Sequence, residues 1–168
     1  MPTLYRGDLD GAGRRVAVIV SRFSKVAIRK TSIGDVLLEG CVRRLEEAGV
    51  ASTSIEIAYV PGAYELPLAA KEMAGSRRFD AVVALGAVVR GETPHFEYVA
   101  GECARGLAAV ALDSGVPIAF GVLTCDDETQ AVERAGGKHG HKGIEAAEAA
   151  LEMANVLARI RRGSGETR

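Results

Sequence analysis

The segment from Gly86 to Tyr98 (GAVVRGETPHFEY) holds the residues best suited to acid–base chemistry and anion binding. An apolar run ends there in a glycine-bearing loop, and a helix is predicted to begin near Pro94. Free backbone N–H groups of such a loop and helix start attract anions, and the Thr93 hydroxyl adds a donor. Because Glu92 repels a phosphate, these groups rather than its side chain would hold one. His95, whose ordinary pKa is about 6.5, can exchange a proton near neutrality; it could equally be a histidine that only caps the loop.

A second segment, residues 60–67 (VPGAYELP), places a carboxylate after a glycine turn. At the end of a strand, Glu65 could accept hydrogen bonds from the hydroxyl groups of a sugar. The local sequence favours a simpler role, in which Glu65 sits in the first turn of a helix and complements its dipole.

A third segment, residues 133–143 (ERAGGKHGHKG), combines glycines with basic side chains. The basic residues are Arg134, Lys138 and Lys142. They could surround a phosphate dianion, or they could lie on an exposed loop whose charge serves solubility. His139 and His141 have the spacing of a metal-ligand pair, but the sequence places no third ligand, so no metal site is predicted.

Phe23 and Phe120 are apolar residues at or near the ends of predicted strands. Each could pack in the core, which is the usual place of a Phe, or form the wall of a pocket for a flat ring. Their spacing does not decide between a core position and a pocket wall.

The elements that must position these residues alternate along the chain. Short β-branched runs predict strands at residues 15–21, 55–60, 80–89 and 116–124. Helical spacing predicts helices at residues 38–49, 66–73, 94–110, 128–135 and 143–162, and residues 136–142 are expected to form a loop. This alternation indicates an α/β fold with a parallel sheet covered on both faces. Ligands bind at the carboxyl ends of such strands, which points to residues 21–24, 61–65, 90–95 and 124–127.

Composition excludes several other classes of protein. The 168 residues predict one domain over 1–168, with an N-terminal arm at 1–13 and a flexible tail at 163–168. Lys and Arg (21) balance Asp and Glu (22), so no nucleic-acid partner is expected. No apolar run is long enough to span a membrane, and residues 1–13 do not look like an export signal. The three scattered cysteines predict reduced thiols, and hence a cytoplasmic location.

Four motifs together resemble the 6,7-dimethyl-8-ribityllumazine synthase family, the riboflavin synthase beta chains. They are VPGAYELP (60–67), ALGAVVRGETPHFEY (84–98), GVPIAFGVLT (115–124) and AVERAGGKHGHKG (131–143). The resemblance covers residues 7–157 and keeps the family's order and spacing. It implies a flavodoxin-like, three-layer α/β/α sandwich around a mainly four-stranded parallel sheet.

The resemblance also implies roles for individual residues in a site for small-molecule substrates. Phe23 would stack on a pyrimidine ring, and the strand end Ala87, Val88 and Val89 would complete that pocket. The ribityl chain and the uracil edge would be held by Ala63, Tyr64 and Glu65. The sugar phosphate would be bound by Glu92, Thr93, Arg134 and Lys142. His95 would transfer protons, and Phe120 would come from a neighbouring subunit.

The implied activity condenses 5-amino-6-(D-ribitylamino)uracil with 3,4-dihydroxy-2-butanone 4-phosphate without a cofactor or metal. The implied assembly is a homopentamer, and the short loop at 135–143 favours a sixty-subunit icosahedral shell. A non-catalytic scaffold or flavin-binding protein is an alternative, as is another enzyme of the pathway. The chain departs from the family pattern at Ser24, Tyr64, Cys125, Gly137, His139 and His141, none of which removes a catalytic side chain.

Overall fold

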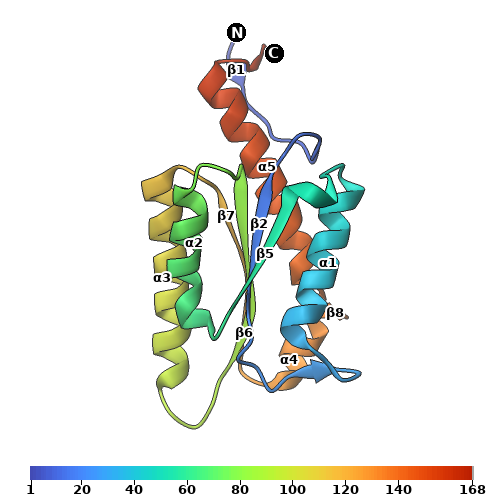
Figure 1. Ribbon diagram of the computed structural model, residues 1–168, viewed down its shortest axis with the longest axis vertical. Helices are drawn as coiled ribbons and strands as arrows, with labels where there is room; N and C mark the ends of the chain where they lie inside the picture. Colours follow the sequence, from blue (N-terminus) through green and yellow to red (C-terminus); the bar gives the residue numbers. More distant parts are fainter. Residues whose placement is uncertain (168) are drawn as a thin grey trace.

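The computed structural model describes residues 1–167 and is built around one central parallel sheet. Its four strands run in the order β5-β2-β6-β7 (Figure 1). They are β2 (Val16–Ser21), β5 (Ile55–Val60), β6 (Ala81–Val89) and β7 (Ile118–Cys125). All residues of β2 and most of β6 are buried. Burial on both faces explains why these central strands are continuous apolar runs rather than alternating ones.

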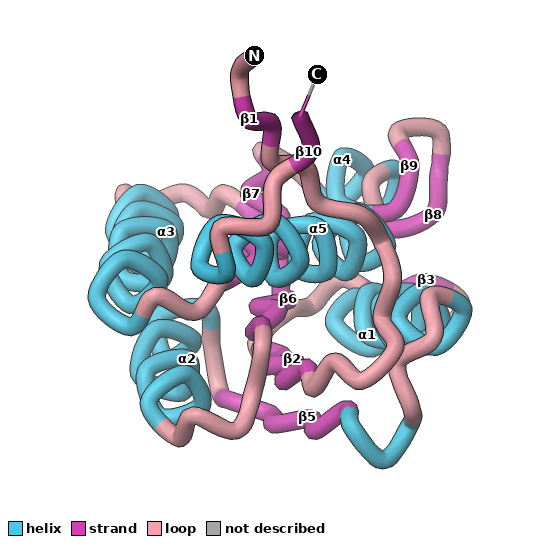
Figure 2. The backbone as a smooth tube through the Cα atoms, turned by 90° about the horizontal axis from the view of Figure 1, so that it is seen from above, coloured by secondary structure: helices cyan, strands magenta, loops and turns pink. Residues whose placement is uncertain are grey.

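Helices cover both faces of the sheet, as Figures 1 and 2 show. Helices α1 (Ile33–Glu47) and α5 (Lys142–Arg162) lie on one face, and α2 (Leu66–Gly75) and α3 (His95–Ser114) lie on the other. The short helix α4 (Glu128–Glu133) follows β7, and single 3-10 turns occur at Ser52–Ser54 and Ala63–Glu65. The predicted α/β class and three-layer sandwich are therefore confirmed.

The two layers of helices form two separate apolar cores. Leu37, Leu45 and Leu151 are fully or almost fully buried on the α1 and α5 side, as are Leu66 and Leu107 on the α2 and α3 side. Burial of one such side chain contributes about 1.5–3 kcal/mol to stability. Together the cores hold the sheet rigid, so that the loops after its strands project from a fixed edge.

Several short antiparallel pairs are present that the sequence did not predict. They are β1 (Thr3–Leu4) with β10 (Glu166–Thr167), β3 (Ala27–Ile28) with β4 (Thr31–Ser32), and β8 (Ala135–Gly137) with β9 (Gly140–His141). Strands of two or three residues are too short to show a period of two. The loop predicted at residues 136–142 is therefore mostly a hairpin. Arg168, the last residue of the predicted tail, lies outside the described residues.

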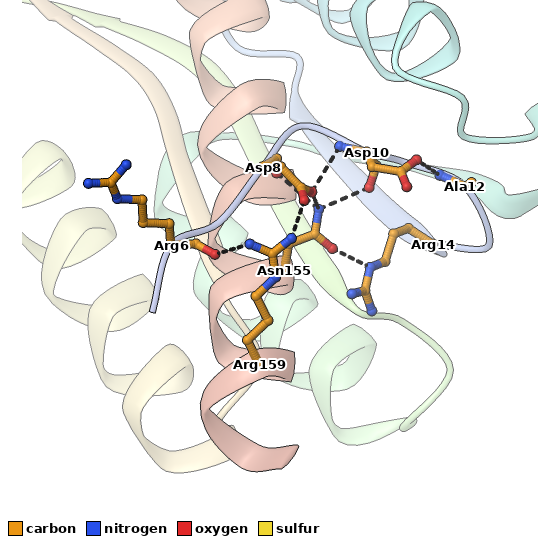
Figure 3. A network of polar contacts seen from close by, with 7 residues as sticks. All are labelled: Arg6, Asp8, Asp10, Ala12, Arg14, Asn155 and Arg159. Atoms are coloured by element: carbon orange, nitrogen blue, oxygen red, sulfur yellow. Dashed lines mark hydrogen bonds and ion pairs between the residues drawn. The ribbon is translucent and has the colours of Figure 1, made fainter. Parts of the chain in front are cut away.

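The N-terminal arm is fixed to α5 by Asn155, which is only 6% exposed (Figure 3). The Asn155 amide nitrogen donates to the carbonyl oxygens of Asp8 and Asp10, both at 2.9 Å, and to the Asp8 carboxylate at 2.8 Å. Its oxygen accepts a hydrogen bond of 2.8 Å from Arg14 Nε. Arg159 also pairs with the Asp8 carboxylate. One buried amide thus uses both its donor and its acceptor to hold the arm against the last helix.

No helix among residues 1–167 is both long enough and apolar enough to cross a lipid bilayer.

We expect Asn155→Ala to lower the free energy of unfolding by about 1–3 kcal/mol, because it removes the hydrogen bonds that the buried amide makes to Asp8, Asp10 and Arg14. Urea unfolding at one fixed protein concentration measures this change. Met153→Ala, at an exposed position of the same helix, is the control and should change stability by less than about 0.5 kcal/mol. Equal effects of the two substitutions would show that the amide does not fix the arm.

Candidate active site

A cavity of about 1090 Å³ opens at the carboxyl ends of the strands. Its walls come from the loops after β2, β5 and β6, from the first turns of α3 and from Glu128 at the start of α4, at the lower edge of the sheet in Figure 1. Nine of the predicted site residues line it: Phe23, Ala63, Tyr64, Glu65, Ala87, Val88, Val89, Thr93 and His95. The loop after β7 (124–127), which the sequence also pointed to, does not line it. Three of the four predicted loops therefore meet at one cavity.

Phe23 is positioned through its backbone rather than by packing in the core. Its N–H donates to the Pro61 carbonyl at 2.7 Å, and the N–H of Arg22 donates to Val60 at 2.9 Å, so the end of β2 is tied to the end of β5. A Cβ on Gly62 would lie 3.0 Å from the Phe23 ring, so glycine lets the ring approach the turn. The side chain is 70% exposed and forms a cavity wall. A flat ring could stack on it.

Glu65 fixes the turn at the start of α2 and also faces the cavity. Its Oε2 accepts a hydrogen bond of 2.9 Å from the Gly62 N–H, which fixes the turn that precedes α2. The side chain also lines the cavity and is exposed there. Because a carboxylate has two oxygens, Oε1 is left to accept hydrogen bonds from a ligand.

The N-terminus of α3 forms part of the cavity wall, and His95 is the first residue of this helix. Thr93 Oγ1 lies 3.5 Å from the His95 backbone nitrogen, and both side chains are exposed at the cavity. A helix of 20 residues carries a partial positive charge at this end and has free N–H groups there. The arrangement can bind an anion beside a side chain that exchanges protons.

Arg90 organises this wall, and the sequence did not single it out. Its guanidinium donates to Asp126 at 3.0 Å, pairs closely with Glu97 and lies 4.4 Å from the centre of the Phe96 ring. The hydrogen bond from Arg90 holds the pKa of Glu97 below its ordinary value, and the bonds to Asp126 and Glu97 raise the pKa of Arg90. These contacts fix the loop between β6 and α3. In the sequence, the position of Arg90 at the end of a strand was a signal for a role at the site. Its partners Asp126 and Glu97 could not be read from the sequence, because they lie 36 and 7 residues away.

Four predicted residues do not line the cavity. Glu92 is exposed on the loop before α3. Phe120 lies in the first half of β7, remote from its carboxyl end, and is 42% exposed. Arg134 ends α4 and donates to the Gln130 carbonyl at 3.1 Å, and Lys142 begins α5 beside Glu145, 2.5 Å away. Within one chain, Arg134 and Lys142 therefore lie away from the cavity, which is lined by other basic residues, Arg22, Lys25 and Arg90.

Within residues 1–167, no three His, Cys, Asp or Glu side chains are grouped so that they could hold a metal ion.

The floor of the cavity depends on a close approach between β2 and β6. A Cβ on Gly86 would lie closer than 3.0 Å to the Ser21 hydroxyl, and Ser21 is only 3% exposed. Glycine at position 86 therefore lets the Ser21 side chain fit between the strands immediately before they enter the walls of the site.

We expect Gly86→Ala to cost about 1–3 kcal/mol of stability because the added methyl group overlaps the Ser21 side chain. Chemical denaturation of the single variants and of Ser21→Gly/Gly86→Ala measures their coupling. The double variant should regain most of the loss. Gly91→Ala, where an added Cβ meets nothing within 4 Å, is the control. Additive effects of the two substitutions would contradict the proposed overlap.

The fold and the cavity define a flavodoxin-like α/β protein with a small-molecule site at its strand ends. The family model of 6,7-dimethyl-8-ribityllumazine synthase matches residues 13–158. The chain therefore belongs to the 6,7-dimethyl-8-ribityllumazine synthase family, whose members are transferases of riboflavin biosynthesis. The resemblance drawn from the four sequence motifs is confirmed.

Proposed function

We propose that this chain condenses 5-amino-6-(D-ribitylamino)uracil with 3,4-dihydroxy-2-butanone 4-phosphate to give 6,7-dimethyl-8-ribityllumazine, phosphate and water. The observation that carries the proposal is the meeting of nine predicted substrate residues at one cavity in a chain of this family. Holding two substrates in register makes an otherwise bimolecular reaction effectively unimolecular, which can supply much of the acceleration.

The uracil is assigned to the apolar part of the cavity. Its ring would stack on Phe23 and lie against the end of β6 at Ala87, Val88 and Val89, which carries no charged side chain. The ribityl hydroxyls would donate to Glu65, beside the backbone of the turn at 62–64. An aromatic wall and one free carboxylate oxygen suit a flat, hydroxyl-bearing substrate.

The sugar phosphate is assigned to the start of α3. The helix N-terminus and Thr93 would hold its anionic end, and His95 would transfer protons as the amine adds to the ketone and phosphate departs. Arg134 and Lys142 would complete the phosphate site as charged donors.

The predicted residues divide by position in a way that favours a site shared between copies of the chain. Those lining the cavity lie between positions 23 and 95, whereas Phe120, Arg134 and Lys142 lie outside it at positions 120–142. Phe120 is exposed on β7, an edge strand of the sheet. We therefore propose that a neighbouring copy supplies these three side chains in a homopentamer, with a sixty-subunit shell as the larger assembly. The three free, buried cysteines suit a reducing, cytoplasmic compartment.

We expect purified protein to accelerate lumazine formation from the two substrates, followed by absorbance against a protein-free control. His95→Ala should lower kcat about 10²- to 10⁴-fold through loss of proton transfer. Arg134→Ala should lower kcat/KM for the butanone phosphate about ten- to a hundredfold. Arg105→Ala, on the exposed side of α3, is the matched control. Intact oligomers without acceleration would instead indicate a scaffold or ligand-binding protein.

If the site is shared between chains, two variants of low activity should restore activity to each other when each carries its substitution in a different half of the site. In oligomers co-expressed from His95→Ala and Arg134→Ala chains, random assortment leaves both side chains intact at about a quarter of the sites. Co-expression of His95→Ala with Thr93→Ala is the control, since both residues line the same cavity and no site should recover. Activity of the first mixture no higher than that of its parents, or a strictly monomeric protein in light scattering, would exclude the shared site.

A further inference from the structure

The imidazole of His141 is enclosed by glycines from three segments of the chain. A Cβ on Gly40 of α1 would lie closer than 3.0 Å to its ring. A Cβ on Gly143 of α5 would lie 3.1 Å from the ring, and one on Gly136 of β8 would lie 3.3 Å from it. A larger residue at position 40 would displace the ring. His141 is therefore inserted between the first helix, the β8–β9 hairpin and the start of the last helix.

His141 is also the N-cap of α5. Its Nδ1 accepts a hydrogen bond of 3.4 Å from the backbone N–H of Ile144. The acceptor must be an unprotonated nitrogen, because a protonated imidazole has donors only. A positive charge would also be unfavourable at the N-terminus of a helix of 21 residues. The cap therefore requires neutral His141.

The hairpin that His141 closes carries the two basic residues assigned to phosphate. His141 pairs with Ala135 across the hairpin, and the next residue, Lys142, donates its backbone N–H to the Arg134 carbonyl at 2.8 Å. Arg134 and Lys142 thus lie side by side at the base of the hairpin. The position of the His141 ring determines where that base sits on α1 and α5.

We propose that His141 is a positioning residue for Arg134 and Lys142, and that its protonation in acid loosens their hold on phosphate. This inference rests on the proposed function, in which those two side chains bind the phosphate of the sugar substrate.

The surroundings of His141 favour its neutral form. Burial is the main cause that lowers its pKa, and Arg43 of α1 adds to it; the carbonyls of His141 and Val36, and Glu145 of α5, act in the opposite direction. Several other charged groups on these elements pair with one another. They are Arg44 with Glu148, Lys142 with Glu145, and Glu133 with Lys138 and His139.

The sign of the pH dependence follows from the lowered pKa. Above the ordinary histidine value of about 6.5, both folded and unfolded chains hold the residue neutral, and the cap contributes fully. As the pH falls below that value, the unfolded or uncapped state takes up a proton first, so the contribution of the cap is lost.

The test compares His141→Asn, His141→Ala and His139→Asn with the wild type at pH 7.5 and 5.5. Asn can accept the Ile144 hydrogen bond but does not titrate in this range. His139→Asn makes the same substitution at the exposed tip of the same hairpin. All four proteins retain His95, so this residue cannot account for a difference between them.

At pH 7.5, His141→Ala should raise KM for the butanone phosphate about fivefold, the factor that corresponds to the usual free-energy cost of losing a helix cap. KM for the uracil substrate should stay unchanged. His141→Asn should restore the wild-type value. In the wild type and in His139→Asn, KM for the butanone phosphate should rise as the pH falls to 5.5, and in His141→Asn this additional rise should be absent. Equal acid dependence in His141→Asn and the wild type would overturn the proposal, even if His141→Ala fails to fold.

Binding of inorganic phosphate, measured by calorimetry with the same four proteins, separates this proposal from the proposed function. Weaker phosphate binding by His141→Ala, with recovery in His141→Asn, supports the positioning role even if lumazine formation is not accelerated. Unchanged phosphate binding in His141→Ala, in a protein that does form lumazine, overturns the positioning role and leaves the proposed function intact.

Discussion

The parallel pairing of β2 with β6 at the centre of the sheet is the interaction on which the cavity depends. The register, which pairs Val20 with Leu85, brings Ser21 and Gly86 together at the last step before the strands enter the cavity walls. Because all four strands are parallel, their carboxyl ends emerge at the same edge. Residues more than seventy positions apart, such as Phe23 and His95, can therefore line one cavity.

Beyond this edge, hydrogen bonds fix the loops that form the walls. Backbone bonds tie Phe23 to the end of β5, the Glu65 carboxylate fixes its own turn, and Arg90 joins the loop before α3 to Asp126. The bond from Arg90 to Asp126 is exposed to solvent, so it contributes less stability than the two cores do. Together these hydrogen bonds hold the loops in place while the Phe23 ring and one oxygen of Glu65 still face the cavity.

The sequence predicts the large elements well and the small ones poorly, for a physical reason. Strand 55–60 is observed with the predicted bounds, and strand 80–89 differs by one residue, because apolar, β-branched runs of this length favour a strand. The hairpin at Ala135–His141 could not be foreseen, since a run of glycines has no periodicity to read. The importance of Arg90 also escaped prediction, because its partners are brought near only by the fold. Motifs assign Arg134 a role, but a sequence cannot say at which copy's site that role is carried out.

The source of the positive charge for the phosphate connects the proposed site to the assembly of several copies. A helix N-terminus alone stabilises an anion by about 0.3–1 kcal/mol when exposed to solvent, which is weak binding for a phosphate dianion. Arg90, the cation next to this helix start, is already paired with Asp126 and Glu97. In the proposed arrangement the missing charge comes from a second copy, on a hairpin whose position depends on the neutral His141 ring. Each chain then contributes the ring-binding half of one site and the phosphate-binding half of the next, so that no chain can act alone.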